Sequence, residues 1–337
     1  MIKMKIALDV YGADHAPEEI LKGAFLAAVD MPEDELILVG NCEEMGRICA
    51  EQGWRAGNVT MEDAKQVISM TDEPATSVRT KKDSSLVRAA QLVAQGRADA
   101  MVSAGNTGAV LAAATLIVKR IKGVRRPALA PILPTYTGQT MLIDCGANVE
   151  CQPEFLRQFA LMGSVYMEKV AGIRNPRVAL ANNGAEETKG TDLAVETHQI
   201  LKTQPINFVG NAEGRDIPMG KCDVVVSDGF TGNLILKTYE GMGKFLMLSM
   251  KDIFYSNLRT KLAALLMKKE VTAFRKKMDY TQYGGAPIMG ICKPVIKSHG
   301  SSKAGEIRNS LLQAKQFSQS GAIESITEMM ACVEADA

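Results

Sequence analysis

The sequence predicts a three-layer α/β/α fold built on a mainly parallel sheet. Short apolar runs alternate with longer segments in which apolar residues recur every three or four positions, a pattern typical of strands joined by crossover helices. Several runs are continuously apolar, as expected for strands that helices cover on both faces. We expect one large domain spanning residues 1–337, with a basic amphipathic helical arm at about 237–277.

Eight apolar runs are expected to form the strands. Each has the length of a buried strand and is bounded by turn residues. In chain order they are Lys5–Val10, Leu36–Val39, Ala98–Ser103, Ala128–Leu133, Thr140–Asp144, Arg177–Ala181, Asn207–Gly210 and Val224–Ser227.

Helices are expected between these strands. One begins near Pro153, since proline is well tolerated at a helix start. Its apolar face holds Phe155, Phe159, Met162, Tyr166 and Val170. The last strong helix ends near Gly321, a common helix terminator, and its apolar positions are Ile307, Leu311, Ala314 and Phe317. Two polar stretches are expected to be mobile: Thr71–Ser85 and the glycine- and proline-rich Tyr280–Ser302.

Small polar residues and glycines follow the predicted strands, at the sheet edge where open α/β proteins bind ligands. Two of these turns share the pattern Gly-x-Thr-Gly. The first is Gly105-Asn106-Thr107-Gly108 and the second is Gly229-Phe230-Thr231-Gly232, followed by Asn233. Glycine lets the backbone approach a ligand, and helix-start amides attract anions. The ordinary turn preference for glycine explains any single turn better, but the whole set predicts a cleft for a phosphate-bearing substrate.

Composition and missing motifs exclude several classes of protein. The net charge is +1, so no general nucleic-acid footprint exists, and the seven cysteines lack any C-x-x-C pair, which favours reduced thiols in the cytoplasm. The start of the chain does not have the pattern of a signal peptide, and no apolar run has the length of a membrane span. Nicotinamide, P-loop and serine-hydrolase fingerprints are absent. The three histidines lack metal-ligand spacing, and His198 is expected to be structural.

Three polar segments could carry the chemistry. His15, near Asp9 and Asp14, could orient phosphate or transfer a proton. The alternative is that Asp14 caps a helix that begins near Pro17. The second segment is Asn182–Gly190 and contains Lys189. The third precedes the last strong helix and offers Lys297 and His299 as anion ligands.

The segment 237–277 has a different character. It contains ten lysines and arginines against three acidic residues, with leucine, methionine and phenylalanine mostly at helical spacing. Such helices lie on anionic membranes or bind acidic proteins, and they also form dimer-facing or core-facing helices with a solvated basic side. The residues expected to bind an acidic protein or a membrane are Lys251, Leu258, Lys261, Leu262, Lys268 and Lys269.

Nine segments, in order along nearly the whole chain, give it a family resemblance. They are DVYGADHAP at 9–17, KKDSS at 81–85, SAGNTGA at 103–109, IKGVRRPALA at 121–130, DCGANVECQPE at 144–154, NNGAEETKG at 182–190, FVGNAEGRDI at 208–217, SDGFTGN at 227–233 and IKSHGSS at 296–302. The chain resembles the phosphate acyltransferases of bacterial phospholipid synthesis, which make acyl phosphate from acyl carrier protein thioesters. One departure is Ala13, where the family usually has a second glycine. A positive φ there would strain the turn.

The resemblance implies a fold similar to those of isocitrate and isopropylmalate dehydrogenases and of phosphotransacetylases. It implies no nicotinamide chemistry, and we expect no cofactor and assign no residue to a metal. It also implies a homodimer that is cytoplasmic and peripherally associated with an anionic membrane. Its partners would be acyl carrier protein, inorganic phosphate and a membrane glycerol-3-phosphate acyltransferase that receives the acyl phosphate.

In the mechanism that we expect, inorganic phosphate attacks the thioester carbonyl and the carrier thiol leaves. The amides of Gly105–Gly108 and Gly229–Gly232 would bind phosphate or the oxyanion, with Asn106 and Asn233 as further donors. The cations that would offset charge are Lys82, Lys189 and Lys297. His15 or His299 could protonate the thiolate, and Asp228 could orient one of these groups.

Two rival functions remain open at this stage. One is a phosphotransacetylase-like enzyme that uses a short acyl-CoA. The other is a non-catalytic membrane scaffold that binds acylated carrier protein. Polar residues crowd five strand-end turns, which is more than an interaction surface needs.

Overall fold

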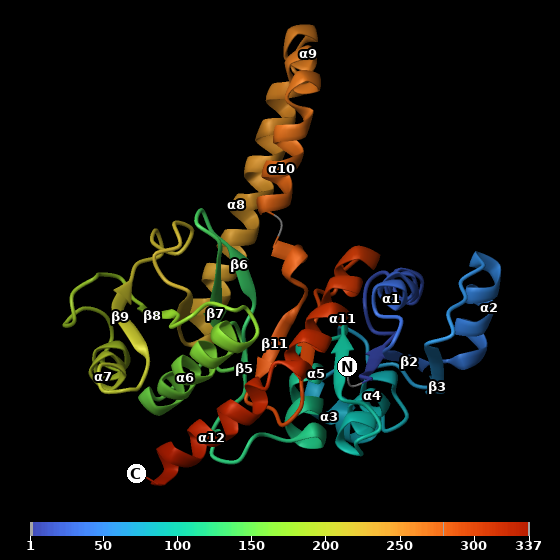
Figure 1. The fold of residues 1–337 in the computed structure, drawn as a ribbon, viewed down its shortest axis with the longest axis horizontal. Coiled ribbons are helices and arrows are strands. Elements are labelled where there is room, and N and C mark those ends of the chain that lie inside the picture. Colours follow the sequence, from blue (N-terminus) through green and yellow to red (C-terminus); the bar gives the residue numbers. More distant parts are fainter. Residues whose placement is uncertain (1–2, 279, 336–337) are drawn as a thin grey trace.

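The computed structural model describes residues 3–278 and 280–335, so the expected domain limits at 1 and 337 lie outside the described residues. The described strands form two sheets, which lie side by side in Figure 1. The first has seven strands in the order β3-β2-β1-β4-β12-β11-β5. Their bounds are β1 Lys5–Asp9, β2 Glu35–Gly40, β3 Val59–Asp63, β4 Ala100–Ser103, β5 Ala128–Leu129, β11 Ala286–Met289 and β12 Val295–Lys297.

The second sheet has five strands in the order β6-β7-β10-β8-β9. Their bounds are β6 Ile132–Pro134, β7 Gln139–Ile143, β8 Arg177–Ala181, β9 Asn207–Ala212 and β10 Val224–Val226. Most neighbours in both sheets are parallel, and the antiparallel pairs involve only β5, β6, β11 and their partners. The expectation of a mainly parallel α/β fold is confirmed, although the strands divide between two sheets.

Helices surround both sheets (Figure 1). Their bounds are α1 Glu18–Asp30, α2 Cys42–Gln52, α3 Pro74–Thr80, α4 Ser85–Ala94, α5 Thr107–Ala113, α6 Pro153–Lys169, α7 Asp192–Leu201, α8 Gly229–Tyr255, α9 Leu258–Leu266, α10 Lys268–Met278, α11 Ala304–Gln319 and α12 Ala322–Ala335. A π-helical turn, η1 (Ala114–Val118), extends α5, and a 3₁₀ turn, η2 (Tyr280–Tyr283), precedes β11. The expected α6 is confirmed, and Phe159 and Met162 on its apolar face are completely buried.

One expected strand, Ala128–Leu133, is in fact two. β5 pairs with β11 in the first sheet, whereas β6 pairs with β7 in the second. The chain crosses between the sheets at Ala130 and Pro131. Proline has no amide hydrogen to donate to a neighbouring strand. The hydrogen bonding between strands is therefore interrupted at Pro131, where the chain passes from the first sheet to the second. A continuous apolar run in the sequence does not show that its two halves pair with strands of different sheets.

Three other expectations are corrected. The stretch Tyr280–Ser302 contains β11 and β12, and β12 pairs with β4 near the middle of the first sheet. The stretch Thr71–Ser85 contains α3. The helix that ends at Gln319 is followed by another, α12. In each case tertiary packing outweighs the local glycine, proline or polar signals. The short, polar β3 was also missed.

The basic arm is formed by α8, α9 and α10, which project together from the body (Figure 1). Its base is fixed to the β6–β7 region, because Lys277 Nζ donates to the Tyr136 carbonyl at 2.7 Å and Tyr239 donates to the Pro134 carbonyl. Large apolar side chains on the arm are exposed, including Leu258 at 85% and Leu266 at 78%. In the described part of the chain, no helix combines the length and hydropathy needed to cross a membrane.

Candidate functional site

A cavity of about 410 Å³ lies between the two sheets and is lined by residues from the ends of their strands. Thr107 of the first glycine loop follows β4 of the seven-stranded sheet, and Asn233, next to the second loop, follows β10 of the five-stranded sheet. Gly146, after β7, lies beside Asn233, since a Cβ there would approach the Asn233 side chain to 3.8 Å. The expected meeting of the two loops at one cleft therefore occurs, but across two sheets.

The chemically richest part of this cavity is a row of polar residues on three neighbouring strands. Asp9 of β1 is in register with Ser103 of β4, and Ser103 is in register with Lys297 of β12. All three are buried, and Lys297 lines the cavity. Ser103 Oγ donates to Asp9 Oδ2 at 2.6 Å and accepts from the Gly105 amide at 3.1 Å. The row thus connects the buried carboxyl directly to the first glycine loop.

Burial shifts both ionisable groups of this row. It raises the pKa of Asp9 from 3.8 to about 6, against the opposing hydrogen bond from Ser103 and the charge of Lys297. It lowers the pKa of Lys297 from 10.5 to about 8, and Asp9 and Asp14 act in the opposite direction. The ammonium group donates to the carbonyl of Ser298 and, at 3.5 Å, to that of Ala104. Among the described residues, these carbonyls are its hydrogen-bond acceptors, and such a buried cation next to a cavity is well suited to bind an anion.

His299 and Asp14 also line the cavity. The Ser301 amide donates to His299 Nδ1 at 3.3 Å, so the proton of a neutral imidazole is on Nε2. Asp14 does not cap α1, because the N-cap residue Pro17 has no side-chain cap bond. The Asp14 amide instead donates to the Gly300 carbonyl at 2.9 Å, which joins the first turn to the segment after β12.

The turn after β1 also explains the departure at Ala13. The positive φ of this turn, 84°, belongs to Gly12, and Ala13 is not among the residues with positive φ. A Cβ at Gly12 would lie 2.9 Å from the Ile68 carbonyl and 3.4 Å from Gly105 Cα. Glycine is therefore required at position 12 for both conformation and close approach, and alanine at 13 causes no strain.

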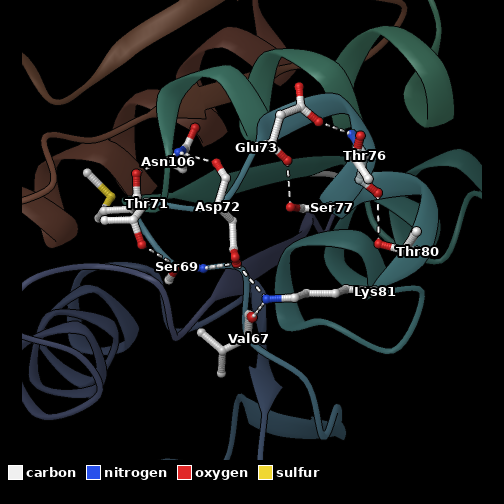
Figure 2. Close-up of polar contacts among 11 residues, drawn as sticks. Val67, Ser69, Thr71, Asp72, Glu73, Thr76, Ser77, Thr80, Lys81 and Asn106 are labelled. Carbon is white, nitrogen blue, oxygen red and sulfur yellow. Dashed lines mark hydrogen bonds and ion pairs between the residues drawn. The ribbon is translucent and has the colours of Figure 1, made fainter.

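In the first loop, the Asn106 side chain is committed to structure (Figure 2). Its Oδ1 accepts from the Ala109 amide at 3.0 Å, which caps α5. Its Nδ2 donates to the carbonyls of Met70 and Asp72 at 2.9 and 3.4 Å. Among the described residues, the amides of Thr107 and Gly108 have no acceptor. In this loop the backbone, rather than the asparagine, is available to a ligand.

We predict that Asn106→Ala destabilises the protein by about 1–2 kcal/mol, as expected for the loss of a helix cap. The substitution also releases the segment around Met70, which lines the cavity. Urea unfolding measures the loss. Lys22→Ala, at an exposed position of α1, serves as the control, and an equal loss in both variants would contradict the capping role.

In the second loop, Asp228 is the N-cap of α8. It accepts from the Thr231 amide at 2.8 Å and from the Thr231 hydroxyl at 2.7 Å. The Gly229 amide donates to the Asn148 carbonyl at 2.7 Å. A Cβ at Gly232 would lie 1.9 Å from the Asp144 carbonyl oxygen. The glycines of this loop therefore allow α8 to pack against the segment after β7, and Asn233 is its cavity-lining residue.

Three of the predicted site residues lie elsewhere. His15 and Lys82 are exposed and do not line the cavity. Lys189 lies beyond β8, at a separate cavity of about 400 Å³ with Glu186, Glu213 and Arg215. Asp9 and Ser103 were not predicted as site residues. The sequence places both at the ends of strands, but it does not show which residues of the neighbouring strands they pair with.

A second cavity, of about 680 Å³, continues from the first towards the base of the arm. Both are lined by Lys237, Glu240, His299 and Glu306. Lys244 and Met247 of α8 and Arg275 and Met278 of α10 line the second one. The two cavities form a groove that becomes more basic towards the arm. The six predicted arm residues do not line either cavity.

The chain is similar to known proteins over nearly its whole length. Residues 4–325 match the model of a family described as fatty acid synthesis protein. A phosphate acyltransferase of Thermoanaerobacter pseudethanolicus is 48% identical over 325 residues, covering 96% of this chain and 97% of the relative. A phosphate acyltransferase of Bacillus licheniformis is 46% identical and covers 93% and 94%.

Solved structures with the same fold include two acyl-transferring enzymes. A phosphotransacetylase from Streptococcus pyogenes has a TM-score of 0.63 at 17% identity and covers 94% of each chain. A branched-chain phosphotransacylase from Enterococcus faecalis has a TM-score of 0.55 at 14% identity, covering 94% of this chain and 99% of the other. The likeness confirms the fold expected from the resemblance. With a full-length family match and relatives at nearly half identity, this chain belongs to the phosphate acyltransferase family.

Proposed function

We propose that this enzyme transfers an acyl group from the thioester of acyl carrier protein to inorganic phosphate and so supplies acyl phosphate for phospholipid synthesis. The observation that carries the proposal is Lys297, a buried cation at the wall of a cavity that both glycine loops border. Two anionic reactants need such a cation, because they otherwise repel each other in the cleft.

In the proposed reaction, a phosphate oxygen attacks the thioester carbonyl carbon, and the C–S bond then breaks. Lys297 and the amides of Thr107 and Gly108 stabilise phosphate and the developing oxyanion. Asn233 donates from the opposite wall. The proton that the attacking hydrogen phosphate loses as it becomes the acyl phosphate ends on the departing thiolate, and the His299 Nε2–H donates a hydrogen bond that stabilises the sulfur as its charge develops. We assign no step to His15, Lys82 or Lys189, which lie outside the cavity, and Asp228 acts only through the shape of the second loop.

The acyl chain is proposed to occupy the apolar part of the cavity. Its lining residues there are Leu129, Pro131, Ile132, Cys145 and Leu236. The groove towards Lys244 and Arg275 then gives the anionic phosphate a basic path into the cavity. The reacting carbonyl thus lies between an apolar region for the acyl chain and a basic region for phosphate.

We further propose that the chain is a homodimer that rests on an anionic membrane through the tip of its arm, near the glycerol-3-phosphate acyltransferase that takes the product. Leu258, Leu262 and Leu265 are 85%, 60% and 66% exposed there, next to Lys261, Lys268 and Lys269. Leucine-rich and basic positions on α9 and at the start of α10 fit an anionic bilayer surface.

Changing both Leu258 and Leu262 to Glu is predicted to abolish flotation with anionic liposomes. The buried apolar area and the attraction to the lipid are lost together, while the catalytic cavity is untouched. Flotation on a density gradient and phosphate-dependent turnover without lipid are measured side by side. Leu116→Glu, at an exposed leucine on the body, is the control. Unchanged flotation of the double variant would contradict membrane contact by the tip.

The decisive test of the function is phosphate-dependent release of free carrier thiol from acyl carrier protein. We expect release of thiol and acyl phosphate in equal amounts, and none without phosphate. Release from a short acyl-CoA alone would identify a phosphotransacetylase-like enzyme instead. Tight binding of acylated carrier without release would identify a scaffold.

A further inference from the structure

The segment 119–126 contains five cations and no acidic residue. Lys119, Arg120, Lys122, Arg125 and Arg126 are all exposed. Lys293, in the turn between β11 and β12, adds a sixth, and it lies close enough to Lys119 for both charges to act on Cys292. We call these six residues the basic loop. Within the described residues, none of them forms an ion pair.

The basic loop is held in a defined shape. The buried Gln158 of α6 accepts from the Arg125 amide at 2.8 Å and donates to the Gly123 carbonyl at 3.0 Å. The Cys292 amide donates to the Lys119 carbonyl at 2.9 Å. Lys119 itself has a positive φ of 77°, which is uncommon for a residue other than glycine. Like charges repel, so fixing five of them on eight residues has an electrostatic cost, and an acidic ligand would relieve it.

The cations surround a hollow. Arg120, Arg125 and Arg126 line a cavity of about 460 Å³ together with Phe155. The Arg126 guanidinium lies over the Phe155 ring, 5.7 Å from its centroid, an arrangement that orients the guanidinium without neutralising it. No acidic residue lines this cavity. The surface therefore presents fork-shaped donors that suit carboxylates and phosphates.

The basic loop is a short distance from the catalytic cavity. Arg126 and the cavity-lining Leu129 are three residues apart, so their Cα atoms are at most about 11 Å apart. A second connection runs through Asn148, whose side chain donates to the Pro127 carbonyl at 2.8 Å and which follows the cavity-lining Gly146 by two residues. A thioester carried on a long arm can reach the cavity from a protein bound here.

We propose that the basic loop is the docking surface for the acidic carrier protein, an inference that rests on the proposed function. The loop offers charge without large exposed apolar side chains between 119 and 126, unlike the leucine-rich tip of the arm. It therefore suits an acidic protein surface better than a bilayer. Because the whole chain has a net charge of only +1, the loop is a local attractor that steers the carrier to one side of the cleft.

The test is a double charge reversal, Arg120→Glu with Arg126→Glu, in the full-length enzyme. We expect KM for the acylated carrier to rise at least tenfold, while KM for phosphate and kcat at saturating carrier remain within twofold of wild type. Added salt is expected to raise the wild-type KM steeply and that of the variant weakly. The matched control is Lys268→Glu with Lys269→Glu on the arm, which changes the same number of charges and leaves KM for the carrier unchanged without lipid.

Several outcomes would overturn the proposal. One is an unchanged KM for the carrier in the loop variant, and another is a larger rise in the arm variant. An equal rise for a short acyl-CoA would mean that the loop binds phosphate groups rather than an acidic protein. Fluorescence anisotropy with labelled, unacylated carrier measures docking without turnover. It therefore separates failure of this surface from failure of the proposed reaction. The milder pair Arg120→Gln and Arg126→Gln replaces the reversal if that variant unfolds.

Discussion

Lys297→Met is expected to lower kcat/KM for phosphate about 100- to 1,000-fold, the effect of removing one preorganised charge donor from a site that stabilises an oxyanion. Lys297 is a buried cation of the catalytic cavity, and its hydrogen-bond acceptors in the described part of the chain are two carbonyl groups. Methionine has a similar length and flexibility but cannot donate. Steady-state kinetics with varied phosphate measure the loss.

The same substitution should leave the free energy of unfolding at pH 7 unchanged or higher. The folded-state pKa of Lys297, about 8, is below its ordinary 10.5. Its charged form is thus disfavoured by the fold at every pH below about 8, and the penalty fades as the pH rises from 8 towards 10.5. Lys303→Met, at an exposed lysine beside the site, is the control for activity. Activity within threefold of wild type in Lys297→Met would remove the basis of the proposed mechanism.

The activity of the wild-type enzyme is expected to follow a bell-shaped pH profile with limbs near pH 6 and pH 8. Activity rises as Asp9 ionises with its pKa of about 6, because its carboxylate accepts from Ser103 and opposes the desolvation of Lys297. Activity falls as Lys297 loses its proton near pH 8. Asp9→Asn should remove the acid limb and move the basic limb to lower pH, because Lys297 then lacks its negative neighbour.

Asp9→Asn is also expected to change the thermal stability of the protein. Ionisation of Asp9 is disfavoured in the fold, so it lowers stability as the pH rises from about 4 to 6. Asp9→Asn removes this loss and should unfold at a higher temperature than wild type above pH 6. Phosphate itself titrates in this pH range, and it does so equally in the pH–activity profiles of the wild type and of each variant. The difference between two profiles therefore reports the ionisation of protein groups alone. His299→Gln is the decisive comparison: an acid limb that disappears there and persists in Asp9→Asn would assign it to the imidazole.

Much of the local chemistry follows from the amino-acid sequence by itself. Buried parallel strands require continuous apolar runs, and strand-end turns require glycine and small polar residues. These rules located β1, β4, β7 and β10 and both Gly-x-Thr-Gly loops. They also brought Lys297 and His299 into the candidate set, since cations and imidazoles beside such turns favour anions. The helical spacing of 237–277 likewise identified the arm.

The tertiary structure alone decided which of these pieces act together. Pairing between strands is set by contacts between residues far apart in the chain, and a run of apolar residues does not name its neighbour. So the split of 128–133 between two sheets and the register that aligns Asp9, Ser103 and Lys297 could not be read from the sequence. The chain specified the reactive side chains through local preference, and only packing determined that Lys297 is buried at the cavity while His15, Lys82 and Lys189 face solvent.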